Sequence, residues 1–127
     1  MSPREVGATV HELTRVDLLA GLPGELLTRL AARMEREDVA SGGAVVQEGE
    51  PGERFYVVLN GLFSVSQASL GARRILRPGD SFGEVALAME IPRTASVRAL
   101  TPSTVASCDR ETFDEFVRPL FYDDVTP

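Results

Sequence analysis

Apolar residues recur at two different spacings along the chain, and the change between them divides the sequence. Residues 24–36 carry apolar side chains three and four positions apart, the spacing of one face of an α-helix. Residues 11–20 also have a helical pattern, and Pro23 with Gly24 separates the two stretches. Residues 1–36 are therefore predicted to form a helical part whose helices cover the core.

From Glu37 onward, apolar residues recur at every second position and turn residues become frequent. This alternation is typical of short β-strands. The run from Phe55 to Leu59 is strongly apolar, which predicts a buried strand, and Asn60-Gly61 after it is a hairpin signal. Strands are expected at residues 37–40, 44–47, 54–60, 62–67, 73–77, 96–100 and 104–108.

Glycines mark several of the turns between these strands. Gly49, Gly52, Gly61 and Gly79 stand where the chain must reverse direction. We expect each to adopt a positive φ angle, which glycine adopts without steric cost, and to support the strands.

A short helix is predicted after the last strand. Asp109 is suited to cap its N-terminus, and Phe113, Phe116 and Val117 form an apolar stripe. Pro119 is expected to end the helical pattern, because proline cannot continue a helix without losing a hydrogen bond.

The elements together favour a mainly β fold with flanking α-helices. Eight or so short strands with frequent turns and a helix at each end are typical of an antiparallel jelly roll. We expect a single domain over residues 1–127, with the β-roll at 37–109 and a C-terminal helix and tail at 110–127.

Composition and charge narrow the function classes. The chain has 127 residues, of which 43% are hydrophobic and 25% charged, and it lacks a run of about 18 apolar residues that could span a membrane. No secretory signal is visible, and Cys108 is the single cysteine, which fits a reducing, cytoplasmic compartment. The net charge of −6 repels nucleic-acid phosphates and anionic membranes. We therefore expect no nucleic-acid partner and no membrane insertion, and an anionic ligand would need a local positive pocket.

The sequence offers little for catalysis. His11 is the only histidine, so a zinc or iron site and a Ser-His-Asp triad are both disfavoured. We predict no catalytic residues, no metal site and no enzyme activity.

The strongest chemical signal lies between the predicted strands, at residues 82–97. Gly83 permits a tight turn, and the residues after it can form a helical turn whose first N–H groups attract an anion. Arg93 adds a planar fork of donors suited to phosphate oxygens, and Glu84 can accept from sugar hydroxyls. This arrangement indicates a site for a sugar phosphate or a nucleotide. On residue type alone, the alternative for Arg93 is a surface ion pair with a carboxylate such as Glu90.

Two motifs in this chain resemble those of cyclic-nucleotide-binding domains, as found in cAMP-dependent protein kinase regulatory subunits, CRP-type regulators and cyclic-nucleotide-gated channels. The first resembles the phosphate-binding cassette and reads Phe82-Gly83-Glu84-x-Ala86-Leu87, then, after five residues, Arg93-Thr94-Ala95-x-Val97. The second reads Val45-Val46-x-x-Gly49-Glu50-x-Gly52-x-x-Phe55-Tyr56-Val57-Val58-x-x-Gly61. The resemblance covers roughly residues 13–118. It implies a jelly-roll β-roll, a short helix in the cassette, cAMP or cGMP as ligand and no further cofactor.

The resemblance also implies roles for individual residues. Arg93 is expected to pair with the exocyclic phosphate oxygens, and Glu84 to accept from the ribose 2′-hydroxyl. Backbone N–H groups are expected from Gly83, Val85 and Ala86, while the small side chains of Ala86 and Ala95 let the ligand approach closely. Thr94 can reach the phosphate and the amino group of a guanine, so it permits cGMP without deciding against cAMP. Val45, Val58, Leu76 and Val97 are expected in the core, with the base pocket as the alternative.

The chain departs from the family pattern after the barrel. The long helix that usually caps the purine is not apparent beyond Val117, and no helix-turn-helix module follows. We expect a sensor that favours cAMP, permits cGMP and signals to an attached or associated effector. The open alternatives are a degenerate barrel that acts as a structural or interaction domain, and an enzyme of the cupin type.

Overall fold

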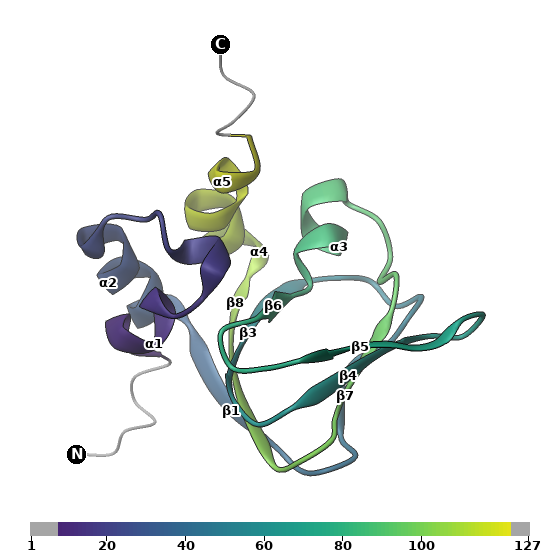
Figure 1. Cartoon of the computed structure of the whole chain (residues 1–127). Coiled ribbons are helices and arrows are strands. Elements are labelled where there is room, and N and C mark those ends of the chain that lie inside the picture. The colour runs from purple at the N-terminus through teal and green to yellow at the C-terminus, as the bar shows by residue number, and fades with distance from the viewer. Residues whose placement is uncertain (1–7, 123–127) are drawn as a thin grey trace.

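Eight strands form two antiparallel sheets of four in the computed structural model, which describes residues 8–122 (Figure 1). One sheet has the order β1-β8-β3-β6 and the other β2-β7-β4-β5. The strands are β1 Glu35–Val39, β2 Ala44–Val46, β3 Arg54–Asn60, β4 Phe63–Gln67, β5 Gly71–Leu76, β6 Ser81–Phe82, β7 Ser96–Ala99 and β8 Ser103–Asp109. The predicted mainly β jelly roll with flanking helices is confirmed.

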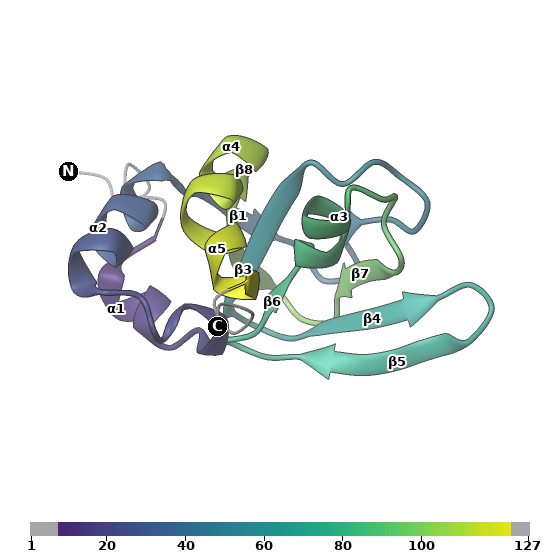
Figure 2. The same ribbon diagram turned by 90° about the horizontal axis from the view of Figure 1, so that it is seen from above.

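The helices gather on one side of the barrel, except for α3, which lies at its rim. Seen from above, the C-terminal helices lie between the N-terminal helices and strand β3 (Figure 2). Their bounds are α1 Val10–Thr14, the 3₁₀ helix η2 Asp17–Leu19, α2 Gly24–Arg33, α3 Glu84–Met89, α4 Arg110–Thr112, the π-helical turn η3 Phe113–Val117 and α5 Arg118–Tyr122. None of the helices within residues 8–122 has the length and apolar character needed to cross a membrane.

Strand β3 is buried on both faces because it separates two hydrophobic clusters. Phe55 and Val57 pack with the helices, whereas Tyr56 and Val58 face the opposite sheet. Successive side chains of a strand point to opposite faces, so both sets had to be apolar. This explains the uninterrupted apolar run that predicted a buried strand.

The N-terminal helices are shorter than their patterns predict. The predicted helix over residues 11–20 is two pieces, because α1 ends at Thr14 and Val16, in an extended conformation, precedes η2. The helix predicted over residues 24–36 ends at Arg33. The backbone from Glu35 pairs with β8 instead, and this strand pairing overrides the helical pattern.

Two further elements differ from the sequence-based expectations. Strand β6 was not predicted; it has only two residues, Ser81 and Phe82, too few to show an alternating pattern. The C-terminal helical stretch continues past Pro119 to Tyr122, so the predicted stop is wrong. In η3 the N–H of Arg118 donates to the carbonyl of Phe113, and Pro119 then stands in the first turn of α5, where a missing N–H costs little. Residues 123–127 of the predicted tail lie outside the described residues, as do residues 1–7 of the predicted helical part.

Candidate functional site

Helix α3 is attached to the barrel through a glycine in the left-handed region. Gly83 has a φ of 92° and precedes the first residue of α3. A Cβ atom at this position would lie 2.8 Å from Nη1 of Arg93 and 2.9 Å from the carbonyl oxygen of Arg54. Both the φ angle and the lack of space therefore require glycine at the junction of β6 and α3.

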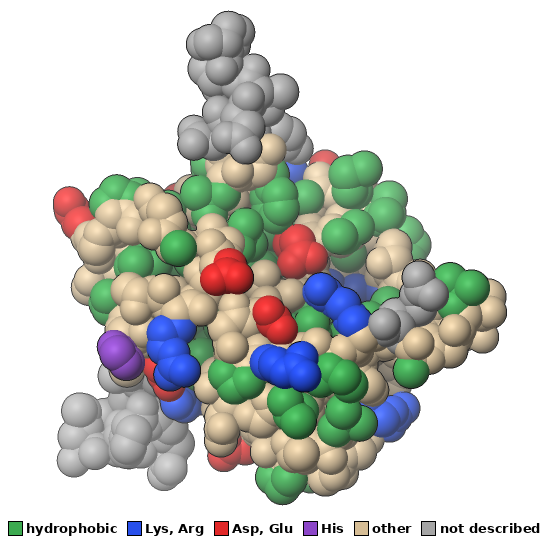
Figure 3. Space-filling view, viewed as in Figure 1, with side chains coloured by type: hydrophobic (Ala, Val, Ile, Leu, Met, Phe, Trp, Pro, Cys, Tyr) green, Lys and Arg blue, Asp and Glu red, His purple; other side chains and the backbone are tan. Residues whose placement is uncertain are grey.

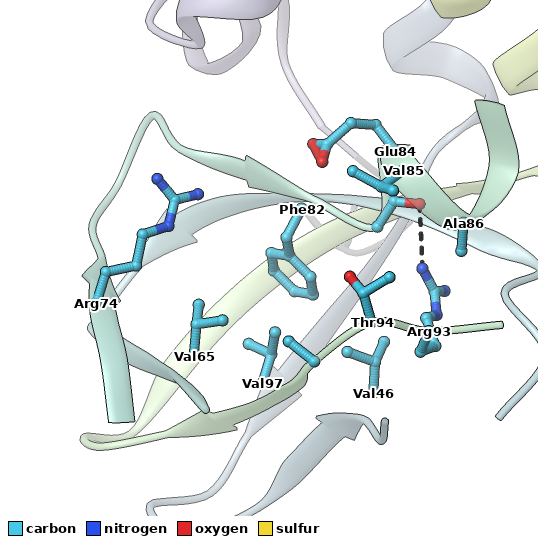
Figure 4. A pocket seen from close by; sticks show the side chains of 12 residues that line it. Val46, Val65, Arg74, Phe82, Glu84, Val85, Ala86, Arg93, Thr94 and Val97 are labelled. Atoms are coloured by element: carbon cyan, nitrogen blue, oxygen red, sulfur yellow. Dashed lines mark hydrogen bonds between the residues drawn. The ribbon is translucent and has the colours of Figure 1, made fainter. Parts of the chain in front are cut away.

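A pocket of about 170 Å³ opens beside the start of α3 (Figure 4). All the residues predicted for the site contribute to its lining: Gly83, Glu84, Val85, Ala86, Arg93, Thr94 and Ala95. The remaining lining residues come from strands of both sheets and are Val46, Val65, Arg74, Phe82 and Val97. Within residues 8–122, the C-terminal helices contribute nothing to this lining, so they do not cover the pocket.

Arg93 is a buried cation whose partners are carbonyl groups. Arg93 is 7% exposed, and its guanidinium donates to the carbonyl oxygens of Gly83 at 3.1 Å and Arg54 at 2.8 Å. It also lies 5.9 Å from the centroid of the Tyr56 ring. No ion pair joins Arg93 to a carboxylate among the described residues, so the alternative pairing with Glu90 is not formed.

The burial of Arg93 favours an anion nearby. Burial lowers the pKa of its guanidinium, and the Tyr56 side chain and the Glu84 carboxylate only partly oppose this effect. A guanidinium has five N–H donors, and two hydrogen bonds to carbonyls leave others for a ligand. A buried charge without a partner of opposite sign is costly, so an anionic group in the pocket would stabilise it.

Gly52 makes room for Arg93 from behind. A Cβ atom on Gly52 would lie 3.2 Å from Cζ of Arg93 and 2.3 Å from Cβ of Ala86. Gly49, Gly61 and Gly79 have the predicted positive φ angles, but Gly52 does not. The prediction was therefore wrong for Gly52, where glycine is required by the close packing of a loop against Arg93 and α3.

Glu84 is the acidic group of the pocket. Its side chain is half-buried, and Figure 4 shows its carboxylate turned away from the Arg93 guanidinium. Burial raises the pKa of this carboxyl, while nearby N–H groups, Arg74 and the Ser81 hydroxyl oppose the rise. The carboxylate is therefore only partly compensated and is available to accept from a ligand hydroxyl.

The raised pKa of Glu84 predicts a sign for its effect on stability in the ligand-free protein. The folded state binds this proton more tightly than the unfolded chain, whose value is near 4.5. The contribution of Glu84 to the free energy of unfolding is therefore largest below the unfolded pKa and decreases as pH rises through the folded pKa. Urea denaturation of the parent and of Glu84→Gln from about pH 4 to pH 7 measures this contribution as a difference. The free energy of unfolding of the parent minus that of the variant is expected to fall as pH rises, and a rise in this signed difference would contradict the assignment.

The small and exposed residues of the predicted set lie at the rim and wall of the pocket. Ala86 is buried, whereas Val85 and Thr94 are exposed. The Thr94 carbonyl accepts from Nε2 of Gln67 at 2.9 Å, which connects the segment between Arg93 and β7 to β4. Ala86 and Ala95 present only methyl groups, so the wall beside Arg93 stays open to a ligand.

Arg74 is a lining residue that the sequence analysis missed. It lies on β5 opposite Val65 of β4, and Figure 4 shows it across the pocket from Arg93. The alternation of β5 was an available signal, because Arg74 and the buried Leu76 share one face of the strand. Val58, Leu76 and Val97 belong to the core and Val45 packs against it, and Val97 also lines the pocket.

Charge and shape together define what the pocket can hold. Two arginines and one glutamate line it, against a net charge of −6 for the chain, and Figure 3 shows acidic and basic side chains interspersed on the face of the molecule seen in Figure 1. Apolar side chains of the two sheets lie between the charged groups. A ligand with an anionic group, hydroxyls and a flat apolar part matches this lining. In the part of the chain that the structure describes, no group of three or more His, Cys, Asp and Glu side chains could hold a metal ion.

Known proteins are similar to this chain in sequence and in fold. The sequence model of the cyclic nucleotide-binding domain matches residues 36–119. The cAMP-dependent protein kinase regulatory subunit of Eremothecium gossypii is 36% identical over 108 residues, which are 85% of this chain and 24% of that protein. The cGMP-dependent protein kinase egl-4 of Caenorhabditis elegans is 32% identical over 114 residues, which are 85% of this chain and 15% of that protein.

A solved structure gives the same result for the fold. The regulatory domain of Toxoplasma gondii PKA, crystallised with cAMP, superposes with a TM-score of 0.85 at 27% identity, over 92% of this chain and 48% of that chain. This chain therefore spans less than two thirds of each relative. The match over most of the chain, together with the pocket at the cassette, confirms the resemblance: this chain belongs to the family of cyclic nucleotide-binding domains.

Proposed function

We propose that this chain is a regulatory domain that binds cAMP or cGMP in the pocket beside α3 and performs no catalysis. The observation that carries the proposal is Arg93, a buried guanidinium without a carboxylate partner among the described residues, at the wall of a pocket that also contains Glu84. The relatives support it, because their names and the cAMP in the Toxoplasma gondii structure specify cyclic nucleotides.

Each predicted site residue has a role in this proposal. Arg93 binds the exocyclic phosphate oxygens through its unused N–H donors, and Glu84 accepts from the ribose 2′-hydroxyl. The N–H groups of Gly83, Val85 and Ala86 at the start of α3 face the phosphate and the sugar of the ligand. The small side chain of Ala95 leaves space for these ligand groups. The apolar side chains from the two sheets contact the base.

The identity of the base, adenine or guanine, is a separate point of the proposal. Thr94 is compatible with both nucleotides, and we retain cAMP as the favoured ligand. Arg74 supports cGMP as a second candidate, because a guanidinium bonds O6 and N7 of guanine in a bidentate manner and adenine lacks this pair of acceptors.

Calorimetric titration with cAMP and cGMP, with 5′-AMP as the control, tests the proposal. We expect micromolar or tighter binding of at least one cyclic nucleotide and much weaker binding of 5′-AMP, and the ratio of the two affinities identifies the base. Absence of binding to either nucleotide, in a folded sample without copurified ligand, would contradict the proposal and favour a structural or interaction domain.

Glu84→Gln is expected to weaken binding of the ribonucleotide selectively. A hydrogen bond to a charged group contributes about 1.5–3 kcal/mol, so cAMP affinity is expected to fall roughly tenfold to a hundredfold. The affinity for 2′-deoxy-cAMP, which lacks the donor, is expected to change little. Parallel titrations of parent and variant measure both effects, and equal losses for the two ligands would remove Glu84 from the ribose role.

We also propose that the domain signals to an effector in the same or another chain. Ligand binding alters the positions of α3 and of the C-terminal helices that contact it. An effector that prefers one arrangement of these helices therefore responds to the ligand. The buried, unpaired Cys108 supports a cytoplasmic location. The acidic net charge supports the expectation that this domain has no nucleic-acid partner and does not insert directly into a membrane.

A further inference from the structure

Two arginines of the C-terminal helices hold the C-terminal end of α3. The guanidinium of Arg118 donates to the carbonyl oxygens of Leu87 at 2.9 Å and Ala88 at 3.1 Å. Arg110 donates to the carbonyls of Leu87 at 3.4 Å and Gly52 at 3.2 Å. The last carbonyls of a helix have no intrahelical partner and carry partial negative charge, so cations here satisfy and stabilise this end of α3.

Residues of η3 orient the Arg118 side chain. Its Nε donates to Asp114 at 2.8 Å, and its guanidinium lies 5.6 Å from the centroid of the Phe113 ring. The π-helical turn ends at Val117, and the N–H of Arg118, the next residue, donates to the Phe113 carbonyl. Such a turn rotates the residues that follow it relative to a regular α-helix. Arg118 therefore joins η3 and α5 to α3 through a set of directed contacts.

The opposite end of α3 belongs to the ligand pocket. Gly83, Glu84 and Ala86 line the pocket, while Leu87 and Ala88 contact the arginines. The helix has six residues, about 9 Å of axial length, so a displacement at its first turn reaches its last. Glu90 closes α3 with a φ of 56°, an uncommon conformation for a residue other than glycine, which marks this end as constrained.

The contacts continue from the C-terminal helices to α2. Glu115 of η3 forms ion pairs with Arg29 at 3.3 Å and Arg33 at 2.6 Å. The same two arginines lie over the ring of Phe116. A movement of η3 would therefore also alter its contacts with the N-terminal helices.

We propose that Arg118 is a positioning residue that transmits occupancy of the pocket from α3 to the helices η3 and α5. This proposal rests on the proposed function, since it requires a ligand at the start of α3. Arg118 does not line the pocket, so its loss affects the response to the ligand more than ligand affinity.

Hydrogen exchange measured by mass spectrometry on the full chain tests this role. In the parent, saturating cAMP or cGMP is expected to change the exchange of residues 113–122 by about tenfold. Arg118→Gln is expected to bind the nucleotide within about threefold of the parent, yet to lose this ligand-dependent change. Arg33→Gln is the matched control, because Arg33 contacts the same helices through Glu115 and does not bond to the α3 carbonyls. A ligand response at residues 113–122 that persists in Arg118→Gln would overturn the proposal.

A ligand-free comparison separates this proposal from the proposed function. Without nucleotide, Arg118→Gln is expected to accelerate exchange of the Glu90 and Ile91 amides, which bond to the Ala86 carbonyl, by about tenfold. Arg118→Lys, which keeps the charge without the planar fork, is expected to give a smaller acceleration and serves if the glutamine variant does not fold. Unchanged exchange at the Glu90 and Ile91 amides would overturn the role of Arg118, whether or not the parent binds a cyclic nucleotide. Failure of the parent to bind a cyclic nucleotide would instead refute the proposed function.

Discussion

Arg93→Ala is expected to lower the affinity for the cyclic nucleotide by about 3 kcal/mol, or about a hundredfold. The substitution removes the buried guanidinium, the only arginine of the described chain that bonds the Gly83 and Arg54 carbonyls beside the pocket. In the proposed complex the phosphate would then be desolvated without a charged partner. Calorimetric titration with the nucleotide bound by the parent measures the loss.

Two further variants make this result specific. Arg98→Ala is the control, because Arg98 is exposed, donates to the Gly42 carbonyl at 2.6 Å and does not line the pocket. Arg93→Lys keeps a cation but not the planar fork, so it is expected to bind between the parent and the alanine variant. Thermal unfolding of each variant confirms that it is folded. Binding by Arg93→Ala as tight as by the parent would refute the assignment of the phosphate site.

Gly52→Ala is expected to damage both the fold around α3 and ligand binding. The new methyl group would meet Cβ of Ala86 at 2.3 Å and Cζ of Arg93 at 3.2 Å, so α3 or the loop must move. Inserting a methyl group into a packed site costs about 1–3 kcal/mol of stability, and displacement of Arg93 is expected to weaken ligand binding at least about tenfold. Urea denaturation and nucleotide titration measure the two effects separately.

Gly21→Ala is the matched control for this substitution. A Cβ atom on Gly21 would meet nothing within 4 Å, and Gly21 lies outside the set of glycines with positive φ. The same chemical change is therefore expected to leave both stability and binding close to the parent. If Gly52→Ala also behaved like the parent, the space behind Arg93 would not be needed for the site.

The residues that lie close together along the chain were accessible to sequence analysis. Gly83, Glu84 and Arg93 form one segment, and the chemistry of a turn, a helix start and a cation is local enough to be read from residue types and spacing. All the predicted site residues line one pocket, although their contacts with a ligand stay predictions. The apolar run from Phe55 to Leu59 predicted a buried strand because its burial on both faces required apolar residues at every position.

Element ends were less predictable, because long-range pairing competes with local preference. Residues after Arg33 have a helical pattern but pair with β8, whose residues stand about seventy positions later. Pro119 predicted the end of a helix. The π-helical turn before it instead places this proline in the first turn of α5, where its missing N–H costs little.

By itself, the sequence determined the mainly β class, the segment that forms the site, and its candidate phosphate and hydroxyl partners, because these depend on periodicity and on neighbouring residue types. Only the tertiary structure decided what surrounds Arg93 and α3. Each of the contacts that surround them joins segments distant in the chain. These are the hydrogen bond from Arg93 to the Arg54 carbonyl, the close packing of Gly52 against Ala86 and Arg93, the place of Arg74 in the pocket lining, and the hydrogen bonds from Arg118 to α3. Such contacts depend on how the elements pack. They cannot be predicted from the type of a residue and its neighbours in the sequence.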